Sequence, residues 1–344
     1  MKRTKLLSLF IIILFLTLII AGCGGETKKA EEPVAQKTEE KKEEVKPIVA
    51  IAADVVAPEH HLGQALDFFA QKVEEKSGGK MKIEVHHAGA LGGERDILEG
   101  IKQGSMHFAA PGGGMLEIFY KPAGIFTYPY IFKDREHTDR VWDKLLTEFS
   151  QELEKESGFK GLAILNRPAR NLSTSKPVKS VEDMKGLKIR VPETKMWQET
   201  FKSFGAAPTP LAFTELYTAL KTGVVDGQDN PIALTYSSGF FEVNKYYSLI
   251  GHMYQDNIIV TSGSWFQSLP PDLQKVVTEA GQETQAYCRK LSLDVENSLY
   301  EKAEKEFGVE IIEPDLSGFR AAVDGLISEF PDVKVWYDKI KAID

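Results

Sequence analysis

The chain has 344 residues, of which 42% are hydrophobic and 27% charged, so it has enough apolar material for a substantial core in one large domain or two lobes. Its formal charge of −8 argues against nucleic acid as a partner.

The N-terminus has the pattern of an export signal. Basic residues within 1–5 precede an almost wholly apolar run over 6–20, and small residues lead to Cys23. This order predicts a signal peptide over 1–22 rather than a plain transmembrane anchor, because the glycines around Cys23 suit an extended, protease-accessible segment. The residues before Cys23 also resemble the lipobox of bacterial lipoproteins, whose cysteine is acylated. We therefore expect an exported protein, lipid-anchored through Cys23 at the outer face of the cytoplasmic membrane or in the periplasm.

A charged segment separates this anchor from the rest of the chain. Residues 23–46 are dominated by Glu and Lys and contain almost no large apolar side chain. Such a segment cannot bury a core, which predicts a disordered tether, with a charged solvated helix as the alternative. Lipidation of Cys23 would leave Cys288 as the only other cysteine, so no intramolecular disulfide would form.

The remaining residues, from 47 onward, alternate between strand and helix patterns. Strands are predicted over 48–53, 81–85 and 106–110, with helices over 62–76 and 94–103 between them. This alternation predicts βαβ units around a parallel sheet.

A second α/β set follows further along the chain. It comprises strands over 160–165, 187–191, 207–210, 256–262 and 309–312, helices over 195–204 and 213–222, a long helix over 271–307, and helical material at the C-terminus. A helix as long as that over 271–307 can reach across two lobes.

Standard enzyme signatures are missing. The sequence has no Gly-x-Ser-x-Gly elbow, no His-Glu-x-x-His, no Walker loop and no calcium loop, so we expect neither an enzyme nor a cofactor. Gly112 opens a run of three glycines after the strand over 106–110. Such a run can offer backbone N–H groups to an anion, and a tight turn is the alternative.

Two histidine pairs raise the question of a metal site. Neighbouring histidines on a strand point to opposite faces, and no cluster of Cys or carboxylates shares a fixed spacing with them, so we expect no metal. His60 and His61 differ from His86 and His87 because they lie in the loop after the first predicted strand, where α/β folds place ligand contacts, and His61 is kept as a candidate contact.

Arg190 and Asn230 are the candidate polar contacts. Arg190 lies near the end of the predicted strand over 187–191, which Pro192 stops, and its guanidinium there can offer a two-pronged pairing to a carboxylate. A surface ion pair is the structural alternative. Asn230 precedes Pro231, which favours an extended backbone and presents the amide to a ligand, with a plain turn as the alternative.

Three segments resemble, in order and spacing, the substrate-binding proteins of TRAP transporters, the DctP family. They are 183–192 (DMKGLKIRVP), 208–213 (PTPLAF) and 225–231 (VDGQDNP). Weaker matches extend the resemblance to 91–95, 129–130 and 269–274.

The resemblance implies an α/β fold in the form of a two-lobe, periplasmic-binding-protein-like clamp, with the long helix spanning both lobes. Lobe I would comprise 47–167 and 256–295, and lobe II would comprise 168–255 and 296–344. Such a protein captures a small organic acid and delivers it to the permease subunits in the membrane.

The resemblance also implies roles for particular residues. Arg190 matches the family's carboxylate-binding arginine and Arg170 a second basic contact. Asn230 matches the amide contact and Phe213 an aromatic residue of the cleft. Glu94 lies within one of the weaker matches and is a further candidate contact.

One stretch departs from the family pattern. Sialic-acid-binding members carry a Glu and an Arg after the third strand, whereas residues 111–115 here hold glycines and Met115. This puts sialic acid in doubt and indicates a less polar or differently shaped wall. Trp197, Tyr128 and Tyr236 are candidates for aromatic surface around it, although Trp197 also has the spacing of a core residue.

Three rival functions stay open at this point. A ligand-sensing lipoprotein would use the same clamp without a permease, and the binding protein of an ATP-driven importer would share the architecture without these motifs. A lipoprotein enzyme would need a nucleophile and base at recognisable spacing, and none is found.

Overall fold

The computed structural model describes residues 46–344, apart from the side chains of residues 293–297, and shows two β-sheets. The first sheet has the strand order β2-β1-β3-β10-β4. Its strands are β1 (Ile48–Ala53), β2 (Met81–His86), β3 (Phe108–Ala109), β4 (Phe159–Leu165) and β10 (Asn257–Ser262).

The second sheet has the strand order β11-β9-β5-β8-β6-β7. Its strands are β5 (Arg170–Thr174), β6 (Lys188–Val191), β7 (Ala207–Pro210), β8 (Gly227–Asn230), β9 (Tyr246–Met253) and β11 (Glu310–Ile312).

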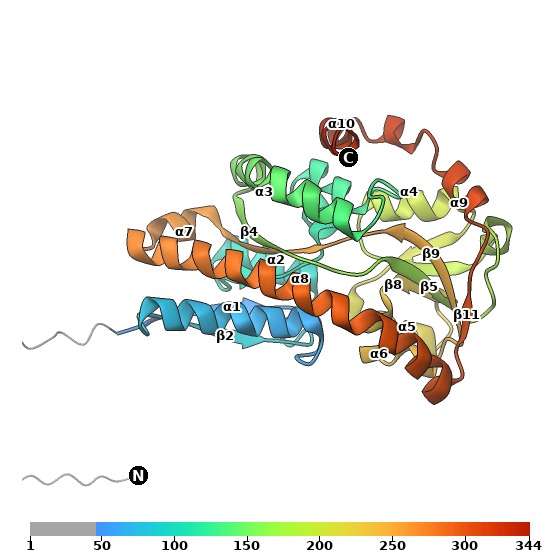
Figure 1. Cartoon of the computed structure of the whole chain (residues 1–344), viewed down its shortest axis with the longest axis horizontal. Helices are drawn as coiled ribbons and strands as arrows, with labels where there is room; N and C mark the ends of the chain where they lie inside the picture. The colour runs from blue at the N-terminus through green and yellow to red at the C-terminus, as the bar shows by residue number, and fades with distance from the viewer. Residues whose placement is uncertain (1–45) are drawn as a thin grey trace, which may run out of the picture. The chain divides into compact units, whose positions relative to one another are not determined.

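Helices surround both sheets (Figure 1). The α-helices are α1 (His61–Ser77), α2 (Glu94–Gln103), α3 (Arg135–Ser157), α4 (Lys195–Ser203), α5 (Leu216–Lys221), α6 (Ile232–Ser237), α7 (Gly263–Ser268), α8 (Pro271–Phe307), α9 (Leu316–Ala322) and α10 (Lys334–Lys341). Short 3-10 helices include η1 (Gly113–Ile118), η2 (Lys121–Thr127) and η4 (Phe213–Glu215). None of the helices in residues 46–344 is long and apolar enough to cross a membrane.

The predicted βαβ units are found, because β1 runs parallel to both β2 and β3, but neither sheet is parallel throughout. Strand β10 runs antiparallel to both β3 and β4, and β5 runs antiparallel to both β8 and β9. The chain passes from β4 in the first sheet to β5 in the second, and returns from β9 to β10. These strands enter their new sheet directly, without the crossover helix that would make them parallel to their neighbours.

Helix α8 packs against both halves of the protein. Its first part contributes Leu273, Val277 and Cys288 to a core shared with α1 and β1, whereas Leu299 and Ala303 pack with Phe241 and other residues beside the second sheet. The diagonal course of α8 past α1 and on toward α6 is visible in Figure 1. The predicted α/β fold with a long helix spanning both halves is therefore confirmed.

The predicted signal peptide, Cys23 and nearly all of the tether over 23–46 lie outside the described residues. The residue boundaries of the lobes stay a prediction, and the side chains at the boundary in α8 are not described. The C-terminal helix α10, which that prediction gives to lobe II, lies beside α3: Trp336 stacks edge-on against Phe149, and His137 bonds to the carbonyl of Ile343.

Candidate functional site

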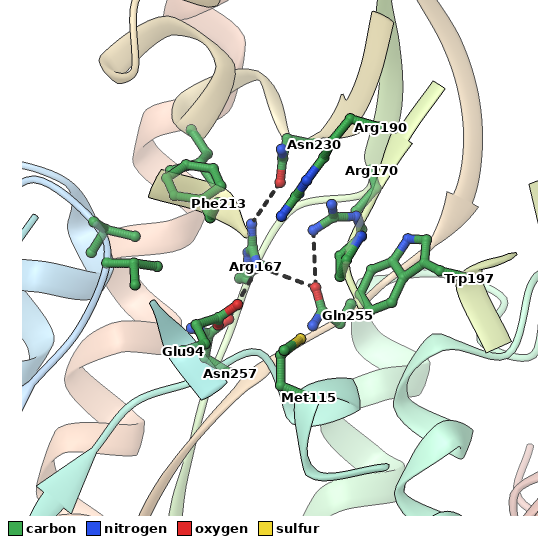
Figure 2. A pocket seen from close by; sticks show the side chains of 14 residues that line it. Glu94, Met115, Arg167, Arg170, Arg190, Trp197, Phe213, Asn230, Gln255 and Asn257 are labelled. Atoms are coloured by element: carbon green, nitrogen blue, oxygen red, sulfur yellow. Dashed lines mark hydrogen bonds between the residues drawn. The ribbon is translucent and has the colours of Figure 1, made fainter. Parts of the chain in front are cut away.

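A small cavity, partly open to solvent, lies where strand ends of the two sheets meet. The first-sheet side contributes residues after β1, the start of α2 and residues of η1, and the second-sheet side contributes ends of β5, β6 and β8 together with α4 and η4 (Figure 2). The lining residues are Val55, Val56, Glu94, Met115, Arg167, Arg170, Arg190, Pro192, Trp197, Phe213, Asn230, Leu234, Gln255 and Asn257.

Arg190 reaches the cavity from the end of β6 and is only 3% exposed. Its Nε and Nη2 both donate to the carbonyl of Leu211, at 3.0 and 2.8 Å, and its guanidinium lies 5.8 Å from the centre of the Phe213 ring. Burial lowers the pKa of Arg190 to about 10, so it is still a cation at neutral pH. Within the described part of the chain, no carboxylate forms an ion pair with it, which leaves its charge available to a ligand.

Arg167 follows β4 and lies beside Arg190 in the cavity (Figure 2). Its Nη1 donates to Gln255 Oε1 at 3.2 Å and to Asn257 Oδ1 at 3.1 Å, and its Nη2 lies 3.4 Å from Asn230 Oδ1. All these partners are neutral amides, and its buried Nε has no partner among residues 46–344. Burial, reinforced by repulsion from Arg170, lowers the pKa of Arg167 to about 9.

Arg170 is held differently, because it is neutralised by the protein. Its Nε donates to Asp229 Oδ2 at 2.7 Å, and the same oxygen accepts from Trp197 Nε1 at 3.2 Å and lies 3.2 Å from His252 Nε2. Burial alone would raise the pKa of Asp229, but Arg170 and His252 together hold it well below its usual range. Arg170 therefore presents Nη1 to Gln255 Oε1 at 2.9 Å while its charge is balanced.

Glu94 is the acidic residue of the cavity lining. Its Oε1 accepts the N–H of Gly112 at 2.7 Å. Burial raises the pKa of Glu94, opposed by that N–H and by the three arginines. The Gly112 N–H was predicted as a possible anion contact. In the structure it is bound by a carboxylate of the protein itself, that of Glu94. Gly112 has a second role, because a Cβ there would lie 2.1 Å from Gln255 Nε2.

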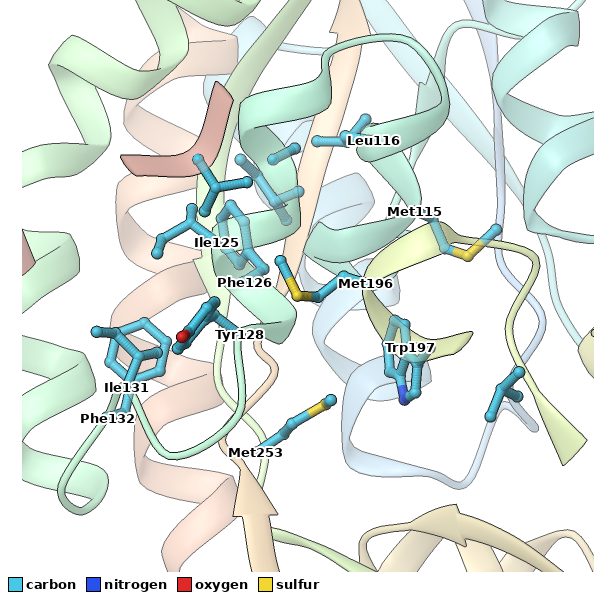
Figure 3. Packing of buried hydrophobic residues seen from close by; sticks show 14 of the residues in the cluster. Met115, Leu116, Ile125, Phe126, Tyr128, Ile131, Phe132, Met196, Trp197 and Met253 are labelled. Atoms are coloured by element: carbon cyan, nitrogen blue, oxygen red, sulfur yellow. The ribbon is translucent and has the colours of Figure 1, made fainter. Parts of the chain in front are cut away.

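Apolar side chains form the remaining walls. Met115 and Trp197 belong to a core cluster that continues away from the cavity through Met196, Phe126 and Met253 (Figure 3). Trp197 therefore fulfils both predicted possibilities, as a fully buried core residue that also lines the cavity. Its ring lies 5.0 Å from the Arg170 guanidinium carbon.

The structure brings most of the predicted site residues together. Arg190, Arg170, Asn230, Phe213, Glu94 and Trp197 all line the cavity. Four other candidates do not line it: Gly112, whose N–H is bound by Glu94, Tyr128, whose ring packs against Tyr337, and Tyr236 and His61. The hydroxyl of Tyr236 donates to Glu306 on α8 and its ring packs against Phe307, while His61 is buried with Nε2 3.1 Å from the carbonyl of Asn166.

Sequence reasoning missed three polar residues of the cavity. Arg167 comes two residues after the predicted strand over 160–165, so the strand-exit argument used for Arg190 would have found it. Gln255 and Asn257 flank the start of the predicted strand over 256–262. Their signal is weak, because amide residues before a strand are common in ordinary turns.

His87 and its two ion-pair partners, Asp54 and Asp67, form an ionic brace. Asp54 directly precedes the cavity residues Val55 and Val56 in the chain. His87 Nδ1 lies 3.0 Å from Asp54 Oδ2, and His87 Nε2 lies 3.0 Å from Asp67 Oδ1. The bond to Asp54, opposed by burial, raises the pKa of His87 to about 9.

The brace predicts a loss of stability at alkaline pH. Because the folded-state pKa of His87 is raised, its stabilisation is complete below the unfolded value of about 6.5 and disappears as pH rises through about 9. We expect a loss of about 1 to 2 kcal/mol after allowance for solvent screening. Urea denaturation between pH 6.5 and 9.5 measures it. His87→Gln should lack this slope, and equal slopes in both proteins would contradict the assignment.

The chemistry of the site is that of anion recognition. Three buried guanidinium groups, four amide or carboxylate side chains and apolar walls converge on one space. Residues 46–344 contain no group of three His, Cys, Asp or Glu able to hold a metal ion. The arrangement can pair with a carboxylate and exchange hydrogen bonds with hydroxyl groups.

Comparison with known proteins places these features in a family. The family described as bacterial extracellular solute-binding protein, family 7 (DctP), matches residues 52–332. The 2,3-diketo-L-gulonate-binding periplasmic protein YiaO of Escherichia coli is 31% identical over 281 residues, which cover 80% of this chain and 85% of that protein.

Two solved TRAP periplasmic solute binding proteins have closely similar folds. The protein from Xanthobacter autotrophicus, with bound β-D-galacturonate, has a TM-score of 0.82 at 30% identity and covers 86% of this chain and 100% of its own. The protein from Polaromonas, bound to D-erythronate, has a TM-score of 0.81 at 31% identity and covers 86% of this chain and 99% of its own.

Proposed function

The chain belongs to the DctP family of TRAP-transporter substrate-binding proteins, and we propose that it captures a small polyhydroxylated monocarboxylic acid and delivers it to a TRAP permease. The family consists of extracytoplasmic binding proteins rather than enzymes. The observation that carries the proposal is the pair of buried guanidinium groups, Arg167 and Arg190, which face one cavity and have no carboxylate ion-pair partner among the described residues.

The ligand's carboxylate pairs with Arg190. Two of the Arg190 nitrogens are fixed by the carbonyl of Leu211, so the guanidinium is oriented before the ligand arrives and little rotational freedom is lost on binding. Arg167 lies beside it and adds a second positive charge. A carboxylate placed between them satisfies charges that would otherwise stay buried without a counter-ion.

The other polar groups favour hydroxyls on the rest of the ligand. Asn230, Gln255 and Asn257 offer amides, and Glu94 offers a carboxylate that accepts hydrogen bonds. A second ligand carboxylate facing Glu94 would meet a like charge, which disfavours dicarboxylates. The relatives with bound galacturonate and erythronate support a sugar acid as the class of ligand.

Delivery requires the protein to stay near the membrane. The predicted lipid on Cys23 and the charged segment over 23–46 would hold the binding domain within reach of the permease. Metabolic labelling with a fatty-acid analogue should label the wild-type protein and fail to label Cys23→Ser. Equal labelling of both would contradict the anchor.

Thermal denaturation with candidate acids tests the binding function. A ligand that binds only the native protein stabilises it, by about 2.7 kcal/mol at one hundred times Kd. We expect uronic or aldonic acids to raise Tm, and neutral hexoses and sialic acid to leave it unchanged. A shift produced by C4-dicarboxylates alone would overturn the ligand class, and no shift with any acid would overturn the function.

A further inference from the structure

Three consecutive residues, 255–257, hold Arg167 from two sides. Gln255 and Asn257 accept hydrogen bonds from its guanidinium inside the cavity. Asp256, between them, points the other way, as successive side chains of an extended segment do, and its Oδ1 accepts the main-chain N–H of Arg167 at 2.9 Å. Asp256 is fully buried and does not line the cavity.

The main-chain carbonyl of Arg167 is held as well. Arg135, at the start of α3, donates from Nη1 to that carbonyl at 2.6 Å, and the same nitrogen lies 3.5 Å from Asp256 Oδ1. Both hydrogen-bonding groups of the Arg167 main chain are therefore engaged by one pair of opposite charges. Arg135 also stays outside the cavity lining.

The pair is anchored to the surrounding helices. Asp139 on α3 lies 3.5 Å from Arg135 and accepts from the Asn166 amide at 3.0 Å. Arg289 on α8 lies 3.2 Å from Asp139 Oδ2. Two segments connect the two sheets, one between β4 and β5 and one between β9 and β10. The Arg135–Asp256 pair thus joins α3 to both of these segments. Helix α8 is attached to the pair through Asp139.

We propose that Arg135 and Asp256 form a backbone clamp that positions the Arg167 guanidinium for the ligand's carboxylate. The inference rests on the proposed function and adds two positioning residues that do not touch the ligand.

The need for such a clamp follows from how the guanidinium is held. Its hydrogen-bond partners within the described chain are neutral amides, and a fixed carboxylate there would compete with the ligand for its charge. The direction of a long, flexible side chain then depends on the placement of its own main chain. Displacements of about 0.5 Å are enough to weaken a preorganised site.

Titration calorimetry with the acid that raises wild-type Tm most tests the clamp. Asp256→Ala removes the acceptor of the Arg167 N–H, and we expect affinity to fall about tenfold or more. Asp256→Asn keeps an oxygen that can accept the Arg167 N–H, whereas its new amide takes the place of Oδ2, which accepts from Asn166 Nδ2 at 3.4 Å. Asn should therefore restore part of the affinity that Ala loses.

A control and a double-mutant cycle separate positioning from general destabilisation. Asp143→Asn removes a carboxylate that pairs with Arg289 but contacts neither connecting segment, and affinity should not change. If Asp256 acts through Arg167, Asp256→Ala should cost little further affinity in an Arg167→Met background.

Three results would overturn the clamp: unchanged affinity in Asp256→Ala, equal losses in the Ala and Asn variants, or additive losses in the cycle. If Asp256→Ala does not fold, Arg135→Gln replaces it in the cycle, because it removes the donor to the Arg167 carbonyl from the other side. Failure of the wild-type protein to bind any acid would instead overturn the proposed function.

Discussion

Replacement of Arg190 by alanine should lower the affinity for the acid ligand by more than two orders of magnitude. The ligand carboxylate would lose a desolvated partner that the protein holds in place through the carbonyl of Leu211. Truncating one side of such a buried charge pair costs about 3 to 5 kcal/mol. Titration calorimetry gives the change directly, and thermal shift shows whether the variant still folds.

Two further variants make this result specific. Arg190→Lys keeps the charge but loses the fork that bonds to Leu211, so its affinity should lie between those of wild type and Arg190→Ala. Arg140→Ala removes an exposed arginine on α3 that bonds to the terminal residue Asp344, far from the cavity lining, and should bind normally. Wild-type affinity in Arg190→Ala would show that Arg190 does not carry the carboxylate.

Tyr236 provides a negative test of the sequence-based site. Its hydroxyl bonds to Glu306 and its ring lies outside the cavity lining, so Tyr236→Phe should leave affinity within about twofold of wild type. A large loss measured by the same calorimetry would mean that the cavity extends to Tyr236 when ligand binds.

The elements that the sequence predicts best are those with strong apolar patterns. The bounds of β1 (Ile48–Ala53), α2 (Glu94–Gln103) and α8 (Pro271–Phe307) agree with the predictions. In α2 the glycines on either side mark the ends, and in α8 prolines begin the helix and Gly308 in the left-handed conformation ends it.

The sequence-based prediction lacks three strands, β5, β8 and β9, and β8 is the most polar of them. Strand β8 (Gly227–Asn230) contains no large apolar side chain, yet all four of its residues are buried. Two of its polar side chains meet partners from distant parts of the chain: Asp229 pairs with Arg170, and Asn230 Oδ1 lies 3.4 Å from Arg167 Nη2. A pattern of hydrophobicity cannot predict a strand whose burial depends on these tertiary partners.

The same reason limits prediction of the site. Arg190 and Arg170 both resemble ligand contacts in sequence, but only Arg170 meets a buried carboxylate in the fold. The distinction between an arginine that is neutralised and one that is free for a ligand depends on which strands lie side by side. It therefore becomes visible only when β5, β6 and β8 are placed in one sheet.

Loss of Asp229 should have the largest effect on stability. The carboxylate is fully buried, pairs with Arg170 at 2.7 Å and accepts from Trp197 at 3.2 Å. Asp229→Ala would leave the Arg170 charge buried without a counter-ion, which costs about 3 to 5 kcal/mol of unfolding free energy. Urea denaturation at pH 7 measures the loss.

The contribution of Asp229 to stability depends on pH. Because its pKa is lower in the folded than in the unfolded state, this contribution is complete above the unfolded-state pKa of about 3.9 and disappears as pH falls through the lower folded-state pKa.

The exposed pair of Asp338 and Lys334 on α10 supplies the matched control. The two carboxylate oxygens of Asp338 lie 2.8 and 2.7 Å from Lys334 Nζ, yet both side chains are largely in solvent. Asp338→Ala should therefore lower the free energy of unfolding by less than about 1 kcal/mol. Removing both buried charges, as in Asp229→Leu with Arg170→Met, should recover part of the lost stability, because the penalty comes mainly from the orphaned cation. A double variant no more stable than Asp229→Ala would mean that the contacts of Asp229 with Trp197 and His252, rather than its pairing with Arg170, account for the loss.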